Sequence, residues 1–166
     1  MTMLTPGRFI SSMKRSAVVL DAVLGGVTQE RATVARDGED GWNVIEILCH
    51  LRDFEEIFFS RARQIVAEDV PVLVWWDHEV LALERDYASQ DLNEVFDALL
   101  KTRGEFVAWL KERSADDWQR KGIHPESGEY TLLEQAMQVS LHDLNHLEQL
   151  VRVLGMTAPS DTHVLI

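Results

Sequence analysis

Residues 131–154 read TLLEQAMQVSLHDLNHLEQLVRVL, and this stretch indicates the fold class. Its apolar residues return every three or four positions, which is the spacing of one face of an α-helix. Thr131 at the start and Glu134 three residues later match a capping box, and Gly155 follows the end. The stretch therefore predicts an amphipathic helix of about six turns that buries one face against other helices.

Three earlier segments show the same helical spacing. The first follows Thr5-Pro6, the second opens at residues 43–46 (NVIE), and the third opens at residues 91–94 (DLNE). A shorter helix is expected over residues 75–87, between the second and third segments. No comparable alternation typical of strands appears. We therefore expect an all-α protein: a four-helix bundle with a short extra helix in the connection between helices 2 and 3.

The composition disfavours several classes of protein. The chain has 166 residues, 46% of them apolar and 27% charged, which suits a single domain over residues 1–166. A formal net charge of −12 repels phosphate backbones and anionic lipids, so neither a nucleic acid nor a membrane is expected as a partner. The longest apolar run, Val70 to Trp76, is far shorter than the ~20 residues of a membrane span. One cysteine and no signal-peptide pattern predict a cytoplasmic protein.

Three histidines stand out because of their positions on the expected helices. His142 and His146 are four residues apart, so both imidazoles share one helix face and can reach one ion. His50 lies at the edge of the apolar stripe of the second helix. Such a position lets an imidazole face a crevice while its second nitrogen finds an orienting partner. A chance surface pair is the alternative for His142 and His146, and spacing alone does not assign His50 to the same site.

The chain also carries short motifs in a distinctive order. They are Trp42-Asn43, His50 followed by Glu55, Gly128-x-x-Thr131-Leu132 and His142-Asp143-x-x-His146. In this order and spacing the motifs resemble the DinB-like (YfiT-like) family of small metal-binding four-helix bundles, from about Trp42 to Leu154. Carried over by position, the resemblance implies that His50, His142 and His146 are the ligands of a divalent metal ion.

The resemblance also implies a function. Zinc or nickel is the typical ion, with an open coordination position for water or substrate. We expect a metal-dependent enzyme acting on a small molecule, either a hydrolase or a transferase that uses a low-molecular-weight thiol as cosubstrate. The alternative is a non-catalytic metal-binding or stress-response interaction protein, which a fourth protein ligand would favour. A metalloprotease is disfavoured because Arg152 stands where a third histidine of the extended motif would be.

Two charged residues fall on core stripes. Glu55 lies on the second helix and Arg103 on the third, and an isolated buried charge is costly. We expect them to form an ion pair that fixes helix register, with a role for Glu55 as a general base as the alternative. Asp143 projects into the apolar sector of its helix beside His146. Asp143 is expected either to accept a hydrogen bond from that imidazole and so orient it towards the metal, or to pair with a core arginine.

The remaining residues of interest are aromatic, histidine and cysteine side chains. Trp75, Trp76 and Trp118 are bulky, and we expect them at a homodimer interface, with a substrate crevice as the alternative. The relatives that share the resemblance are often dimers. His124 lies in the segment before the last helix, which is expected to be a loop over the metal mouth, and a solvated histidine is expected there. Cys49 points away from the apolar stripe and is expected to be exposed.

Overall fold

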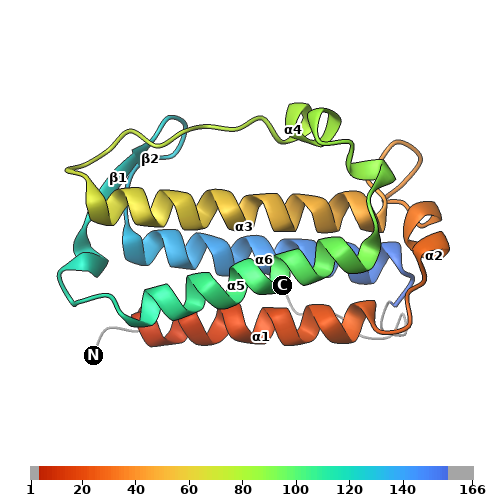
Figure 1. Cartoon of the computed structure of the whole chain (residues 1–166), viewed down its shortest axis with the longest axis horizontal. Coiled ribbons are helices and arrows are strands. Elements are labelled where there is room, and N and C mark those ends of the chain that lie inside the picture. The colour runs from red at the N-terminus through yellow and green to blue at the C-terminus, as the bar shows by residue number, and fades with distance from the viewer. Residues whose placement is uncertain (1–3, 157–166) are drawn as a thin grey trace, which may run out of the picture.

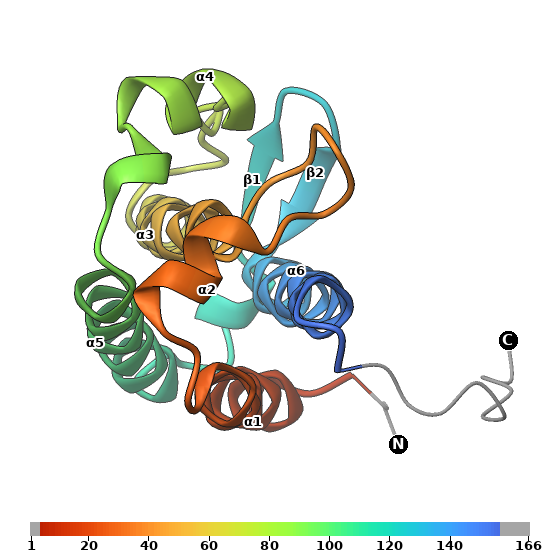
Figure 2. The same cartoon turned by 90° about the vertical axis from the view of Figure 1, so that its right-hand side faces the viewer.

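The computed structural model describes residues 4–156, and its body is a bundle of four long helices (Figure 1). They are α1 (Pro6–Leu24), α3 (Val44–Ala67), α5 (Leu92–Lys111) and α6 (Leu132–Val153). Seen end-on in Figure 2, the four helices occupy the corners of a four-sided bundle, with α3 beside both α5 and α6. The expected all-α four-helix bundle is confirmed.

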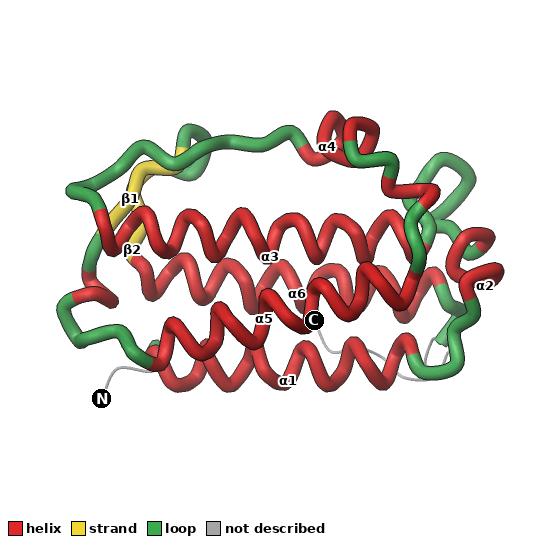
Figure 3. Tube along the Cα trace, viewed as in Figure 1, coloured by secondary structure: helices red, strands yellow, loops and turns green. Residues whose placement is uncertain are grey.

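The order of helix directions follows from one long connection. Helices α1 and α6 run one way along the bundle, and α3 and α5 run the other way (Figure 1). The consecutive helices α3 and α5 are parallel because residues 68–91 return along the outside of α3 before α5 begins (Figure 3). We call these residues the crossover. The crossover therefore covers a side of α3 that faces away from the bundle.

The crossover contains the extra helix, in a shorter form than expected. Its helix α4 spans His78–Glu84, and the 3-10 helix η1 spans Tyr87–Ser89. Helix α4 starts at His78 because the carboxylate of Asp77 accepts hydrogen bonds from the next helical amides, those of Glu79 and Val80. The two tryptophans that precede it lie in extended chain.

Two of the helix starts are full capping boxes. In α3 the side chain of Asn43 accepts from the amide of Glu46 at 2.9 Å, and the Glu46 carboxylate accepts from the amide of Asn43 at 2.7 Å. Thr131 and Glu134 make the same reciprocal pair at the start of α6. At α5, Asp91 caps the following amides, but no bond returns from the third helical residue. The local signals thus fixed where the two histidine-bearing helices begin.

The segment before α6 is a small β-hairpin, so the expected loop was wrong. Strands β1 (Lys121–His124) and β2 (Gly128–Thr131) pair antiparallel. Four residues per strand are too few to show alternation in a sequence. The crossover joins this hairpin through a parallel bridge between Val72 and Ile123. Crossover and hairpin together form a wall along the outside of α3 and α6 (Figure 2). Two short elements, α2 (Gln29–Val34) and η2 (Asp117–Gln119), complete the described chain.

Burial corrects two of the expectations about single side chains. Cys49 is 0% exposed because the crossover covers its side of α3, where its Sγ lies 3.9 Å from the carbonyl oxygen of Tyr87. Burial raises the pKa of this thiol to about 12, so the sulfur stays protonated. Trp118 is also buried, in the half of the core built around Phe106, and is therefore no interface residue.

Candidate metal centre

Three histidines from α3 and α6 converge on the side of these helices that faces the crossover. His50 projects from α3, and His142 and His146 project from successive turns of α6. One ring nitrogen from each residue lies within 4.8 Å of the others. The Nε2 atoms of His50 and His142 are 2.9 Å apart, which suits either a hydrogen bond between neutral rings or joint ligation of a cation. The structure thus brings together the three residues that the sequence singled out.

Aromatic rings hold His50 in place. The ring centroid of His50 lies 4.3 Å from that of Phe54 and 5.1 Å from that of Trp42. His78, the first residue of α4, lies 6.0 Å away by the same measure. The Nδ1 atom of His50 is buried and has no hydrogen-bond partner among the described residues. The orienting partner expected for the second nitrogen is therefore absent here, and packing against aromatic rings takes its place.

Burial keeps the three imidazoles neutral, which is the form that binds metal. Burial lowers the pKa of His50 to about 2, and the neighbouring His142 and His146 lower it further. Burial likewise lowers the pKa of His142 to about 3, helped by electrostatic repulsion from His146, when that ring is protonated, and from Arg103. The pKa of His146 is also lowered by burial, although its hydrogen bond to Gln149 opposes the shift. At neutral pH the cluster therefore presents nitrogen lone pairs.

Gln149 orients His146. The Nδ1 atom of His146 donates to the Oε1 atom of Gln149 at 2.8 Å, which leaves Nε2 unprotonated and free to bind a cation. The amide nitrogen of Gln149 in turn donates to Asp37 at 2.9 Å, and Asp37 also pairs with Arg152. Gln149 was not among the residues that the sequence singled out. Its spacing of three residues from His146 was the available signal, because i,i+3 side chains are neighbours on a helix.

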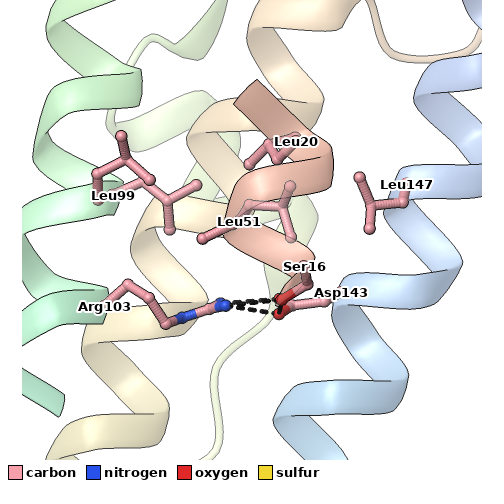
Figure 4. A pocket seen from close by; sticks show the side chains of 9 residues that line it. Ser16, Leu20, Leu51, Leu99, Arg103, Asp143 and Leu147 are labelled. Atoms are coloured by element: carbon pink, nitrogen blue, oxygen red, sulfur yellow. Dashed lines mark hydrogen bonds and ion pairs between the residues drawn. The ribbon is translucent and has the colours of Figure 1, made fainter. Parts of the chain in front are cut away.

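Arg103 lies behind the histidines at the centre of a buried polar cluster. Its Nε and Nη2 atoms donate to the two oxygens of Glu55, both at 2.7 Å. Its Nη1 and Nη2 atoms donate to Asp143 at 2.7 and 2.9 Å, and Nη1 also reaches Ser16 at 3.0 Å. Figure 4 shows Arg103 pointing across the bundle at Asp143 and Ser16, below a layer of leucines. We call these four residues the Arg103 cluster.

The Arg103 cluster decides between the roles considered for its acidic residues. The Glu55–Arg103 ion pair is present, and both carboxylate oxygens of Glu55 are bound to the guanidinium. Asp143 pairs with the core arginine, which was one of its two expected roles, while Gln149 bonds the imidazole of His146. Burial by itself would lower the pKa of Arg103, but the two carboxylates raise it above its usual value. The cluster therefore stays ionic inside the bundle.

A groove extends from the histidines along the wall. A cavity of about 440 Å³ lies over the three histidines and is also lined by His78 and Glu79. A second cavity of about 600 Å³ shares His142 and Phe54 with the first. It runs along the wall, where Trp75, Trp76 and His124 line it. We call the two cavities together the groove. His124 thus lies in the groove wall. Trp75 and Trp76 are half-exposed and line the groove, which agrees with the substrate crevice given above as the alternative to an interface.

Comparisons with known proteins agree with this geometry. The family model described as the DinB superfamily matches residues 13–150. The Bacillus subtilis (strain 168) protein YfiT, whose name describes a metal-dependent hydrolase, is 26% identical over 127 residues, covering 74% of this chain and 70% of YfiT. The solved structure of YfiT is described as a probable metal-dependent hydrolase with an unusual four-helix bundle topology. It matches 93% of this chain and 90% of its own with a TM-score of 0.78 and 21% identity. The chain belongs to the DinB superfamily.

Proposed function

We propose that this protein is a metal-dependent hydrolase of small molecules, with His50, His142 and His146 as the metal ligands. The observation that carries the proposal is the convergence of three neutral imidazoles beneath an open cavity. Among the described residues the cluster contains no fourth histidine, cysteine or carboxylate, which favours an open position over a closed structural site. The name of the relative YfiT and the description of its solved structure point the same way.

The ligand set fits a divalent cation. Imidazole nitrogens suit zinc and nickel, and a cation bound there supplies a Lewis acid that lowers the pKa of water and stabilises developing negative charge. Gln149 holds the tautomer of His146, and the aromatic rings of Trp42 and Phe54 fix the orientation of the His50 ring by packing against it. These residues therefore preorganise the site before a substrate binds.

Hydrolysis also needs a group that accepts a proton. The reaction adds the OH of water to the electrophilic carbon and delivers the remaining proton to the leaving group. Glu55 and Asp143 are bound to Arg103 and do not border the cavity over the histidines. Glu79 lines that cavity and forms no ion pair within the described residues, which supports Glu79 as the group that accepts the proton and releases it again.

Metal analysis of protein purified without an affinity tag tests the ligand assignment. We expect about one divalent ion per chain in the wild type, and its loss in His142→Asn and His146→Asn. His124→Asn is the matched control, because His124 lines the groove but lies outside the cluster. Hydrolysis of small esters and amides should stop on chelation and return with added zinc or nickel. Full metal content in His142→Asn would refute the assignment.

A thiol transferase is the alternative chemistry for the same site. A divalent cation lowers the pKa of a thiol as it does that of water. The thiol would have to come from a small cosubstrate, because Cys49 is buried and protonated. Assays of the metal-loaded protein with a low-molecular-weight thiol and an aromatic electrophile, run beside the ester assays, separate the two reactions. Thiol-dependent turnover without ester hydrolysis would replace the hydrolase proposal.

We also propose that the protein is a cytoplasmic homodimer that binds a small molecule rather than nucleic acid. The acidic net charge supports the absence of nucleic acid, and the exposed apolar side chains of the crossover, among them Val72, Val74 and Leu83, support association. No helix in the described part of the chain is long and apolar enough to cross a membrane. Light scattering should give twice the 19.0 kDa chain mass at micromolar concentration. A monomer would refute the dimer.

A further inference from the structure

Arg61 is a buried cation without a carboxylate partner among residues 4–156. It lies on α3, is 7% exposed, and donates from Nε and Nη2 to a single acceptor, the carbonyl oxygen of Val74 in the crossover, at 3.2 and 2.7 Å. Its Nη1 atom has no hydrogen-bond partner among the described residues, and no acidic side chain among them forms an ion pair with it. Burial lowers the pKa of Arg61, as expected where no anion compensates the lost hydration.

The same side chain lines the groove. Arg61 and His142 border one cavity, together with Phe58, Trp75, Trp76 and Tyr130. The rings of Phe54 and Phe58 lie 5.4 and 5.2 Å from the ring of His142, by their centroids. On the same helix Arg61 follows Phe54 by seven residues and His50 by eleven, rises of roughly 10 and 16 Å. The groove therefore places the histidine cluster near one end, an aromatic lining in the middle and an unpaired guanidinium near the other end.

We propose that Arg61 binds the carboxylate of an elongated, partly aromatic substrate whose reacting bond lies at the histidine cluster. The inference rests on the proposed function, because the cluster supplies the reacting end. A guanidinium with free N–H groups is the donor that suits a carboxylate best, and burial strengthens the bond. The substrate then spans roughly 10–16 Å between its carboxylate and its reacting bond.

The charges around Arg61 favour a single negative charge over a phosphate. The other charged residues of this cavity are acidic: Glu126, Glu129 and Glu134. Glu129 is paired with Lys121, and Glu134 is engaged in the cap of α6, so neither neutralises Arg61. Their field nevertheless opposes a dianion, for which one guanidinium is a weak counterweight. A carboxylate matches the one available positive charge.

Binding of a matched pair of probes tests this assignment. The probes are 4-phenylbutyrate and its neutral amide, 4-phenylbutanamide, titrated into the full-length protein and followed by NMR. We expect the carboxylate to bind about 10- to 100-fold more tightly than the amide, the difference typical of a hydrogen bond to a charged group. Arg61→Gln should abolish this preference while the affinity for the amide stays the same. Arg61→Lys should retain part of it.

Three controls separate the possible outcomes. Arg63→Gln removes the same charge from the same helix, but Arg63 is exposed and stacks on Phe59, so the preference should persist. His146→Asn should also keep the preference, because Arg61 acts without the metal site. Circular dichroism and urea unfolding must show that Arg61→Gln is folded. If it is not, the preference for the carboxylate probe is measured in Arg61→Lys, where it should be reduced but not lost.

The inference and the proposed function can fail separately. A preference that survives in Arg61→Gln, or the absence of a preference in the wild type, including no measurable binding of either probe, would overturn the inference. A preference lost in His146→Asn and kept in Arg61→Gln would mean that the metal binds the carboxylate, which also overturns it. If the wild-type protein binds no metal but shows an Arg61-dependent preference, the inference stands and the hydrolase proposal falls.

Discussion

Arg103 and Arg61 are two arginines with the same degree of burial and opposite surroundings. Arg103 is 6% exposed and Arg61 is 7% exposed. Every N–H group of Arg103 has an acceptor inside the bundle, and two of its partners are carboxylates. Within the described part of the chain, Arg61 has a single hydrogen-bond acceptor, the carbonyl oxygen of Val74. The fold therefore provides full hydrogen bonding for Arg103, whose role is structural, and leaves hydrogen-bonding capacity of Arg61 unused beside the groove.

The largest effect is expected from breaking the saturated region. Arg103→Met should lower the free energy of unfolding by roughly 3–5 kcal/mol, because it leaves Glu55 and Asp143 buried without a counterion. Replacing all three residues by apolar ones of similar volume should cost much less, since no charge is then stranded. Urea unfolding in the presence of a chelator measures both. A single variant within about 1 kcal/mol of the wild type would show that the Arg103 cluster is not a unit.

The next effect concerns the contact that orients a histidine on the groove side. Gln149→Ala should weaken metal binding by about 10- to 100-fold, because Nδ1 of His146 loses the acceptor that fixes its tautomer. Stability of the metal-free protein should change little. Competition with a chromogenic chelator measures the affinity. The matched control is Glu148→Ala, the preceding and solvent-exposed residue of α6; equal affinities for the two variants would contradict the role of Gln149.

The histidines also give the metal-free protein a specific pH dependence. The folded pKa values of His50 and His142, about 2 and 3, lie below the ordinary 6.5, so the unfolded chain binds more protons between these values. Stability therefore falls as the pH drops below about 6.5, by up to about 1.4 kcal/mol per pH unit for each histidine. The variant His142→Asn should lose the contribution of one histidine, so its free energy of unfolding should fall less steeply with pH, by up to about 1.4 kcal/mol per pH unit. The free energy of unfolding is measured between pH 4 and 7 for the wild type and for His142→Asn. Equal slopes of this free energy against pH in the two proteins would contradict the prediction.

The smallest effect sharpens the comparison between the arginines. Arg61→Met should change the free energy of unfolding by less than about 1 kcal/mol, because it strands no carboxylate. The carbonyl oxygen of Val74, an exposed residue, can bond to water instead. A loss as large as that of Arg103→Met in the same urea experiment would assign Arg61 a structural role as the anchor of the crossover.

The sequence predicted most of the bundle and much of the candidate site because those features depend on local spacing. Helix starts follow from residue pairs such as Asn43 and Glu46, and the pairing of His142 with His146 follows from one helical turn. The Glu55–Arg103 pair could be predicted because two charges on core stripes must be compensated. Each of these predictions depends only on residue spacing within one helix or on the free-energy cost of burying an unpaired charge.

The missed features depend on how distant segments pack. The burial of Cys49 comes from the crossover on the outer side of α3, which no periodicity within α3 reports. The hairpin is too short to show a pattern, and the choice between the two roles expected of Asp143 required the relative placement of α5 and α6. Arg61 had a signal that was not used: it falls three residues after Phe58 and four before Ile65, on a buried ridge of the helix.

The bridge between the crossover and the hairpin has a consequence for folding. The amide of Leu73 donates to the carbonyl oxygen of Ile123, and the amide of Ile123 donates to that of Pro71, so this contact joins segments far apart in the chain. Closing such a long loop costs chain entropy before any contact rewards it, whereas the turns of α6 form locally. The wall of the groove should therefore assemble after the bundle and open before it. Hydrogen exchange should show weaker protection at Leu73 and Ile123 than at the centre of α6, and the groove could then admit a ligand by local opening while the helices stay folded.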